Sequence, residues 1–214
     1  MKRLRRVAVV TVLPSALLAE TASYIGSVAC KTCHPQIYER WRKTRMANVV
    51  RDPKEHPEAI LPDLSKPDPL VTFKKEDIAF VYGSKWKQRY FKKAGNDYFP
   101  LPAQWDVTHQ VWRPYFVKDD WWAEHYSPDN AQRPTGPLCD GCHSVNYNIE
   151  TNAVTEWNVG CERCHGPGSD HARKPTRVSI VNPVRLDPLA ANDLCIQCHD
   201  PSMGPMPHAP GAKR

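Results

Sequence analysis

The chain has 214 residues, a formal net charge of +6 and a low mean hydropathy of −0.59. This length fits one domain, and two small domains would be a stretch. Proline and tryptophan are frequent, with 21 and 7 copies, whereas apolar residues are few and scattered. The composition therefore excludes a conventional side-chain core as the only source of buried apolar surface.

The first residues have the pattern of an export signal. A basic start is followed by an apolar run over residues 7–19, and the small residues Ala19, Ala22 and Ser23 are possible cleavage edges. The run is shorter than the ~20 apolar residues that a membrane-spanning helix needs. We expect residues 1–22 to be a signal peptide, with an uncleaved membrane anchor as the alternative. No second apolar run follows, so we expect no stable membrane span after cleavage.

A short helix and a long loop are predicted next. Pro35 is a favourable first helical residue, and Ile37 and Trp41 recur at about one helical turn, which predicts a helix over residues 36–42. Residues 52–69 contain five prolines between charged and small apolar residues. We expect this second segment to be an extended loop.

An aromatic-rich block lies in the middle of the chain. Residues 78–105 predict a β-hairpin that turns near Gly95, with Pro100 and Pro102 favouring an edge position for its second arm. Aromatic residues continue to 126, and from 127 onward we expect loops. The predicted fold is mainly α and irregular with a small β-hairpin. It forms a single domain over 23–214, in which the aromatic-rich block is an insert at about 70–126.

The eight cysteines form four Cys-x-x-Cys pairs, and a histidine directly follows each pair. This is the attachment signal for c-type heme: two thiols bond to the porphyrin edge and the histidine binds iron. The signal predicts four hemes c. The cysteines are Cys30, Cys33, Cys139, Cys142, Cys161, Cys164, Cys195 and Cys198, and the proximal iron ligands are His34, His143, His165 and His199.

Three other uses of Cys-x-x-Cys pairs explain this pattern less well. Zinc sites do not require a histidine after every pair. A thioredoxin-like pair occurs once, within a βαβ pattern that is absent here, and disulfide bonds do not favour one spacing four times. Four hemes also organise a core without many apolar side chains. Their propionates would engage the excess of Lys and Arg, so we expect no nucleic-acid partner.

Low-spin heme iron needs a sixth ligand, from histidine or methionine. The five remaining histidines exceed the number of predicted irons. His171 follows the third motif after a short turn, and aromatic residues flank His125 and His109. These three are the leading distal candidates. Further candidates are Met46, which follows the predicted helix, and His56 and His208, which lie in Pro-rich segments.

The chain resembles the cytochrome c554 family of multiheme cytochromes in three segments. These are YIGSVACKTCHPQIYERW at 24–41, GSKWKQRY at 83–90 and CERCHGPGSDH at 161–171. The resemblance implies closely packed hemes that pass electrons along a chain, and it implies that His171 is a distal ligand. Relatives often carry a histidine where this chain has Arg45-Met46-Ala47, which leaves Met46, a distant histidine or no residue as the sixth ligand of the first heme.

These observations favour an electron-transfer protein of the periplasm or cell surface, exchanging electrons with other redox proteins and having no catalytic residue. Two alternatives remain. One is a reductase or oxidase of a small nitrogen or oxygen species at a five-coordinate heme. The other is a subunit of a conductive filament, because some tetraheme cytochromes of similar size polymerise and take a distal histidine from the next subunit.

Overall fold

The computed structural model describes residues 21–116 and 133–199, and most of the predicted export signal lies outside them. The division into a signal and a single domain therefore stays a prediction. The helical elements are α1 (Ser27–Lys31), α2 (Pro35–Trp41), η1 (Met46–Asn48), η2 (Pro57–Ala59), η3 (Lys75–Asp77), the π-turn η5 (Gly136–Asp140), α3 (Cys161–His165), α4 (Ser169–Arg173), η6 (Pro183–Arg185) and α5 (Pro188–His199).

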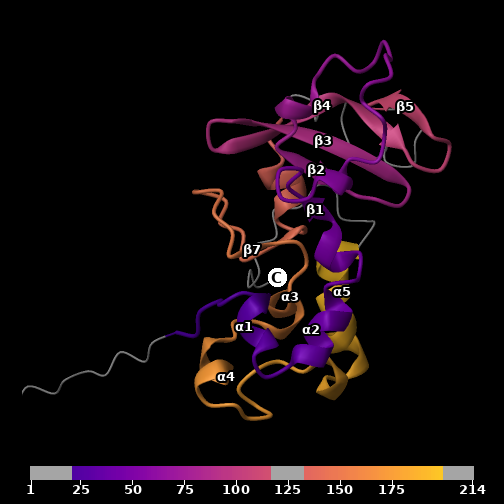
Figure 1. Ribbon diagram of the computed structural model, residues 1–214. Coiled ribbons are helices and arrows are strands. Elements are labelled where there is room, and N and C mark those ends of the chain that lie inside the picture. Colours follow the sequence, from indigo (N-terminus) through magenta and orange to yellow (C-terminus); the bar gives the residue numbers. More distant parts are fainter. Residues whose placement is uncertain (1–20, 117–132, 200–214) are drawn as a thin grey trace, which may run out of the picture.

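The main structural unit is an antiparallel sheet of five strands, arranged in sequence order. Its strands are β1 (Val50–Arg51), β2 (Phe80–Tyr82), β3 (Lys87–Ala94), β4 (Asp97–Asp106) and β5 (Val111–Pro114), and β6 (Ser144–Val145) pairs with β7 (Glu156–Trp157). In Figure 1 the sheet occupies one end of the molecule, and α1, α2, α3 and α4 lie toward the other. The prediction of a mainly α fold was wrong.

The predicted hairpin is confirmed as the β3–β4 pair, which turns at Gly95-Asn96. Its second arm is an interior strand, so the expected edge position is only locally correct. β5 pairs with β4 over Ala103 to Asp106 alone. Pro100 and Pro102, which lack an N–H donor, therefore lie in the part of β4 that β5 leaves without ladder pairing.

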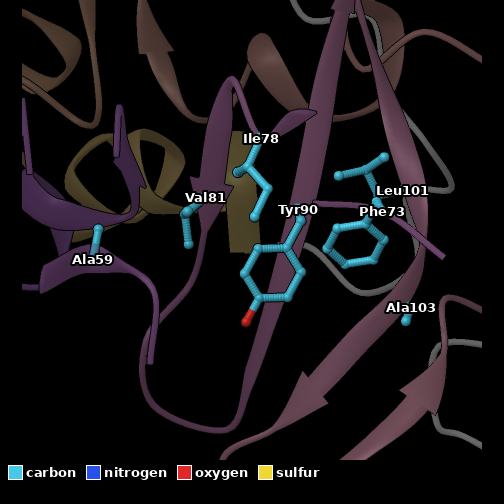
Figure 2. Packing of buried hydrophobic residues seen from close by; sticks show 7 residues of the cluster. All are labelled: Ala59, Phe73, Ile78, Val81, Tyr90, Leu101 and Ala103. Atoms are coloured by element: carbon cyan, nitrogen blue, oxygen red, sulfur yellow. The ribbon is translucent and has the colours of Figure 1, made fainter. Parts of the chain in front are cut away.

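Both faces of the sheet are buried, because successive side chains of a strand point to opposite faces. Val81 packs with Tyr90 on one face, and Figure 2 shows the Tyr90 ring between Val81 and Phe73. Phe80 and Phe91 belong to the cluster on the other face. In the pairing of β3 with β4, a register shift between Arg89 and Phe91 marks an irregularity.

A buried glutamine joins the Pro-rich loop to the sheet. The Gln88 amide donates to the carbonyls of Ala59 (2.8 Å) and Gly83 (3.1 Å). Its oxygen accepts from the Leu61 N–H (2.9 Å) and the Tyr90 hydroxyl (2.7 Å). All its hydrogen-bonding capacity is therefore used, which makes its burial favourable and fixes a loop of little regular structure.

Two left-handed glycines provide a matched test of the β turns. Gly83 and Gly95 have φ angles of 84° and 63°, but a Cβ would lie 2.5 Å from the Lys87 carbonyl oxygen at Gly83 and would meet nothing within 4 Å at Gly95. We expect Gly95→Ala to cost about 1–2 kcal/mol through the backbone conformation. Gly83→Ala should cost about 1–3 kcal/mol more because of the clash. Thermal unfolding of both holoproteins measures this, and equal midpoints would contradict it.

Two glutamates attach the N-terminal segment to the third motif. Glu162, only 2% exposed, accepts hydrogen bonds from the N–H groups of Ile25, Gly26 and Gly168 at 2.7–3.0 Å. Glu156 accepts from the backbone and hydroxyl of Ser27, whose hydroxyl in turn accepts from the Cys161 N–H. These bonds place α1 and the first motif against α3.

The expectation of loops throughout the C-terminal part was wrong at α5, which has 12 residues. The Asp187 carboxylate accepts from the N–H groups of Leu189 (3.0 Å) and Ala190 (3.1 Å), and Pro188 occupies the first helical position. Asp-Pro followed by Leu-Ala-Ala is a helix-start signal. The helix has no buried residues and only a weak apolar face, so hydrophobic periodicity did not indicate it.

Candidate heme sites

Each motif lies on a helical turn that brings its two cysteines to one side. The third motif is the whole of α3, and the fourth forms the C-terminal end of α5. The first spans the end of α1 and the turn to α2, where the His34 N–H donates to the Cys30 carbonyl (2.9 Å). Residues three and four apart are neighbours on a helix surface. This backbone therefore presents both sulfurs and the following imidazole to one porphyrin.

The sulfurs of different motifs lie close together. Cys30 neighbours Cys161, and burial together with this neighbour raises the pKa of the Cys30 thiol to about 11. Cys142 neighbours Cys198, and this neighbour, with the Arg163 guanidinium, holds the pKa of Cys198 below its usual range. The first motif therefore adjoins the third, and the second adjoins the fourth.

The imidazole rings of His34 and His171 lie close together and nearly parallel, and these two residues could hold one heme iron. Their ring centroids are 6.3 Å apart, and their planes differ by 11°. A metal–imidazole bond is about 2 Å long, so two imidazoles on opposite sides of one metal have ring centres about 6 Å apart. The separation of the two rings is therefore compatible with both imidazoles binding one iron. His171 was a leading distal candidate, and the structure brings it to the first motif.

Hydrogen bonds at Nδ1 orient two of the candidate ligands. His165 Nδ1 lies 2.7 Å from the Val181 carbonyl, and His171 Nδ1 lies 3.0 Å from the Ser179 hydroxyl. A partner at one ring nitrogen fixes the tautomer and leaves the other nitrogen for the metal. Val181 and Ser179 would therefore orient these imidazoles toward an iron, and neither residue is indicated by the heme motifs.

The second motif packs against the sheet. His143 is half-buried, with its Nδ1 atom shielded from solvent, and desolvation lowers its pKa to about 4, which favours the neutral imidazole that metal binding requires. Its ring makes an edge contact with Tyr82 from β2, at 5.5 Å between centroids. The Tyr82 hydroxyl donates to the Asp140 carboxylate, which also accepts from Thr135. The buried face of the sheet thereby orients a motif that is distant in sequence.

For four other candidate distal ligands, the described residues show no paired imidazole like that of His34 and His171. Met46 is 52% exposed. His56 lies on an exposed loop near Glu58, with 3.4 Å between Nδ1 and the carboxylate. His125 and His208 lie outside the described residues. The roles of these four residues therefore remain predictions.

His109 is held on the turn between β4 and β5. Its side chain is 65% exposed, and its Nδ1 lies 2.8 Å from the Asp106 carboxylate. Arg113 donates to the same oxygen at 2.7 Å. Although burial opposes it, these hydrogen bonds hold the pKa of Asp106 well below its usual range. The contacts recorded for His109 are with this surface cluster, and its role as a distal ligand also remains a prediction.

Covalent attachment points, proximal imidazoles and a pre-arranged imidazole pair define the class of this protein: it is a multiheme c-type cytochrome. The particular family that it resembles is that of cytochrome c554. The family model described as cytochrome c554 and c-prime matches residues 29–77 and 118–166, and the chain is similar to this family over these two segments. Electron transfer is the function typical of this class.

Two solved multiheme cytochromes share the fold. The outer cell wall cytochrome OcwA superposes with a TM-score of 0.65 at 27% sequence identity. The superposition covers 82% of this chain and 37% of the OcwA chain. An undecaheme cytochrome from the S-layer of Carboxydothermus ferrireducens superposes with a TM-score of 0.58 at 23% sequence identity. This superposition covers 87% of this chain and 27% of the S-layer cytochrome. The chain thus spans well under half of either protein.

A curated relative matches over a short segment. The dissimilatory sulfite reductase MccA of Wolinella succinogenes is 49% identical over 35 residues, which are 16% of this chain and 5% of the reductase. Within residues 21–116 and 133–199, no helix has the length and hydrophobicity needed to cross a bilayer.

Proposed function

We propose that this protein binds four hemes c and transfers electrons between redox proteins outside the cytoplasmic membrane. The observation that carries the proposal is the near-parallel pair of His34 and His171, with 6.3 Å between ring centroids. Two imidazoles at this separation would make the first iron six-coordinate, which suits electron transfer and leaves no open position for a substrate. Heme iron supplies a ferric–ferrous couple that exchanges one electron at a time.

The contacts between motifs support a continuous path. Cys30 neighbours Cys161, Cys164 lies within electrostatic range of Cys195, and Cys142 neighbours Cys198. The order of the motifs along this path is first, third, fourth, second. Cys33 of the first motif and Cys195 of the fourth are exposed. We infer that redox partners make weak, transient contacts near these two motifs.

Location outside the cytoplasmic membrane is proposed from two observations. The N-terminal sequence has the pattern of an export signal, and the two structural neighbours are an outer cell wall cytochrome and an S-layer cytochrome. Whether the protein stays in the periplasm or reaches the surface depends on the host envelope. Self-assembly into a filament would also require the surface location.

A catalytic role at the second motif is the second candidate. The short match to a sulfite reductase favours it, and among the described residues the ring contact of His143 is with Tyr82. A second iron without a distal imidazole would be five-coordinate and could bind a small oxygen or nitrogen species.

Carbon monoxide binding separates these functions. The dithionite-reduced holoprotein is split into monomeric and assembled fractions, four hemes are verified by intact mass, and the Soret band is recorded with carbon monoxide. We expect no spectral change in either fraction, as six-coordinate irons require. A change in both fractions would overturn the carrier proposal in favour of catalysis. A change in monomers alone would show that a neighbouring copy supplies a ligand, as in a filament.

A further inference from the structure

Arg163 is a buried cation without a counter-ion among the described residues. It is the second spacer residue of the third motif, and only 8% of it is exposed. Its Nη2 donates to the Cys198 sulfur at 3.6 Å, whereas Nε and Nη1 have no hydrogen-bond partner. Burying a guanidinium without a charged partner costs several kcal/mol. The two unpartnered nitrogens therefore indicate an acceptor that is not part of the polypeptide.

Nearby protein carboxylates do not provide that acceptor. Glu162 precedes Arg163 in the sequence, but its oxygens accept from the N–H groups of Ile25, Gly26 and Gly168. Among the ion pairs of the described residues, none includes Arg163. Glu162, the acidic residue nearest to Arg163 in the sequence, thus binds backbone N–H groups.

The position of Arg163 is a junction between motifs. The residue belongs to α3, hydrogen-bonds to a cysteine of the fourth motif, and acts electrostatically on Cys142 and His143 of the second. Porphyrins attached at these three motifs would surround it. Each heme c carries two propionates, and a guanidinium matches a carboxylate through two parallel hydrogen bonds.

We propose that Arg163 binds a heme propionate through Nε and Nη1, and that its charge raises the reduction potential of at least one heme at this junction. The inference rests on the proposed binding of four hemes. A positive charge in a region of low dielectric constant favours the ferrous state, which has one more electron than the ferric state. Removal of the guanidinium leaves the propionate charge uncompensated, and both effects lower the potential.

The test compares redox titrations of three holoprotein variants with the wild type. Arg163→Gln removes the charge, Arg163→Lys keeps it but loses the forked geometry, and Arg173→Gln removes an exposed arginine of α4 that pairs with Asp170. Intact mass gives the heme count of each variant. If the wild type lacks four hemes, the proposed function fails, independently of the role of Arg163.

In Arg163→Gln we expect a tenfold lower ferrous-to-ferric ratio for at least one heme at fixed potential, which corresponds to about 59 mV for one electron. Arg163→Lys should recover most of this shift, and Arg173→Gln should show none. Unchanged potentials in Arg163→Gln, with all hemes attached, would overturn the proposal. If that variant does not incorporate its hemes, the potentials of Arg163→Lys decide. Wild-type potentials would support the proposal that the positive charge raises the potential, and a fall as large as that expected for Arg163→Gln would overturn it.

Discussion

His171→Ala should leave one iron without its distal ligand. Because the two imidazoles are 6.3 Å apart and nearly parallel, we expect one heme to become high-spin in the ferric protein. In the reduced protein, carbon monoxide should bind to one heme more than in the wild type. Electronic absorption and carbon monoxide titration, normalised to the heme count, measure both changes.

Arg173→Gln is the control, because this exposed arginine lies on the same helix as His171, pairs with Asp170 and is no candidate iron ligand. It should leave the spin state and the carbon monoxide stoichiometry unchanged. Ser179→Ala removes the partner of His171 Nδ1, so the iron should stay low-spin but at a shifted potential. A fully low-spin spectrum of His171→Ala would remove His171 from the first heme and return Met46 to consideration.

The second large effect is expected at Glu162. Glu162→Ala leaves three backbone N–H groups, of Ile25, Gly26 and Gly168, without their acceptor. A buried donor that loses its partner costs about 1–3 kcal/mol, so we expect a total loss of about 3 kcal/mol or more of local stability. Hydrogen exchange by mass spectrometry of the holoprotein, read over residues 23–27 and 166–169, measures this.

Glu162→Gln keeps one acceptor oxygen and should lose less stability than the alanine variant. Glu58→Ala removes an exposed glutamate from a 3₁₀ turn and should change stability by no more than about 0.5 kcal/mol. If both peptides exchange in Glu162→Ala as slowly as in the wild type, the carboxylate does not hold the N-terminal segment.

The motifs and the strongest local signals could be predicted from the sequence. Cys-x-x-Cys-His depends on covalent chemistry at fixed spacing, and α2 begins at Pro35, a residue that favours this position. The β3–β4 hairpin has long strands and a glycine at its turn. In each case the determining interactions lie within a few residues of one another.

The sheet and the ligand pairing could not be predicted in this way. β1 has two residues and β2 has three, which is too short for alternation to distinguish a strand from a loop. The sequence offered several histidines for the first iron, and the pairing of His34 with His171 depends on the hydrogen bonds that fix α1 against α3. Arg163 lay inside a recognised motif, but the residues around it come from distant segments.

The attachment of the N-terminal segment to the third motif has a consequence for biosynthesis. The bonds from Ile25 and Gly26 to Glu162 span 137 and 136 residues. A chain made from its N-terminus exposes Cys30 and Cys33 long before their structural partners exist. Loop closure over this separation is slow compared with the formation of local contacts. The first heme-binding site to be synthesised therefore waits for Glu156, Glu162 and His171 before its surroundings are in place, and its thiols need protection from oxidation throughout that interval.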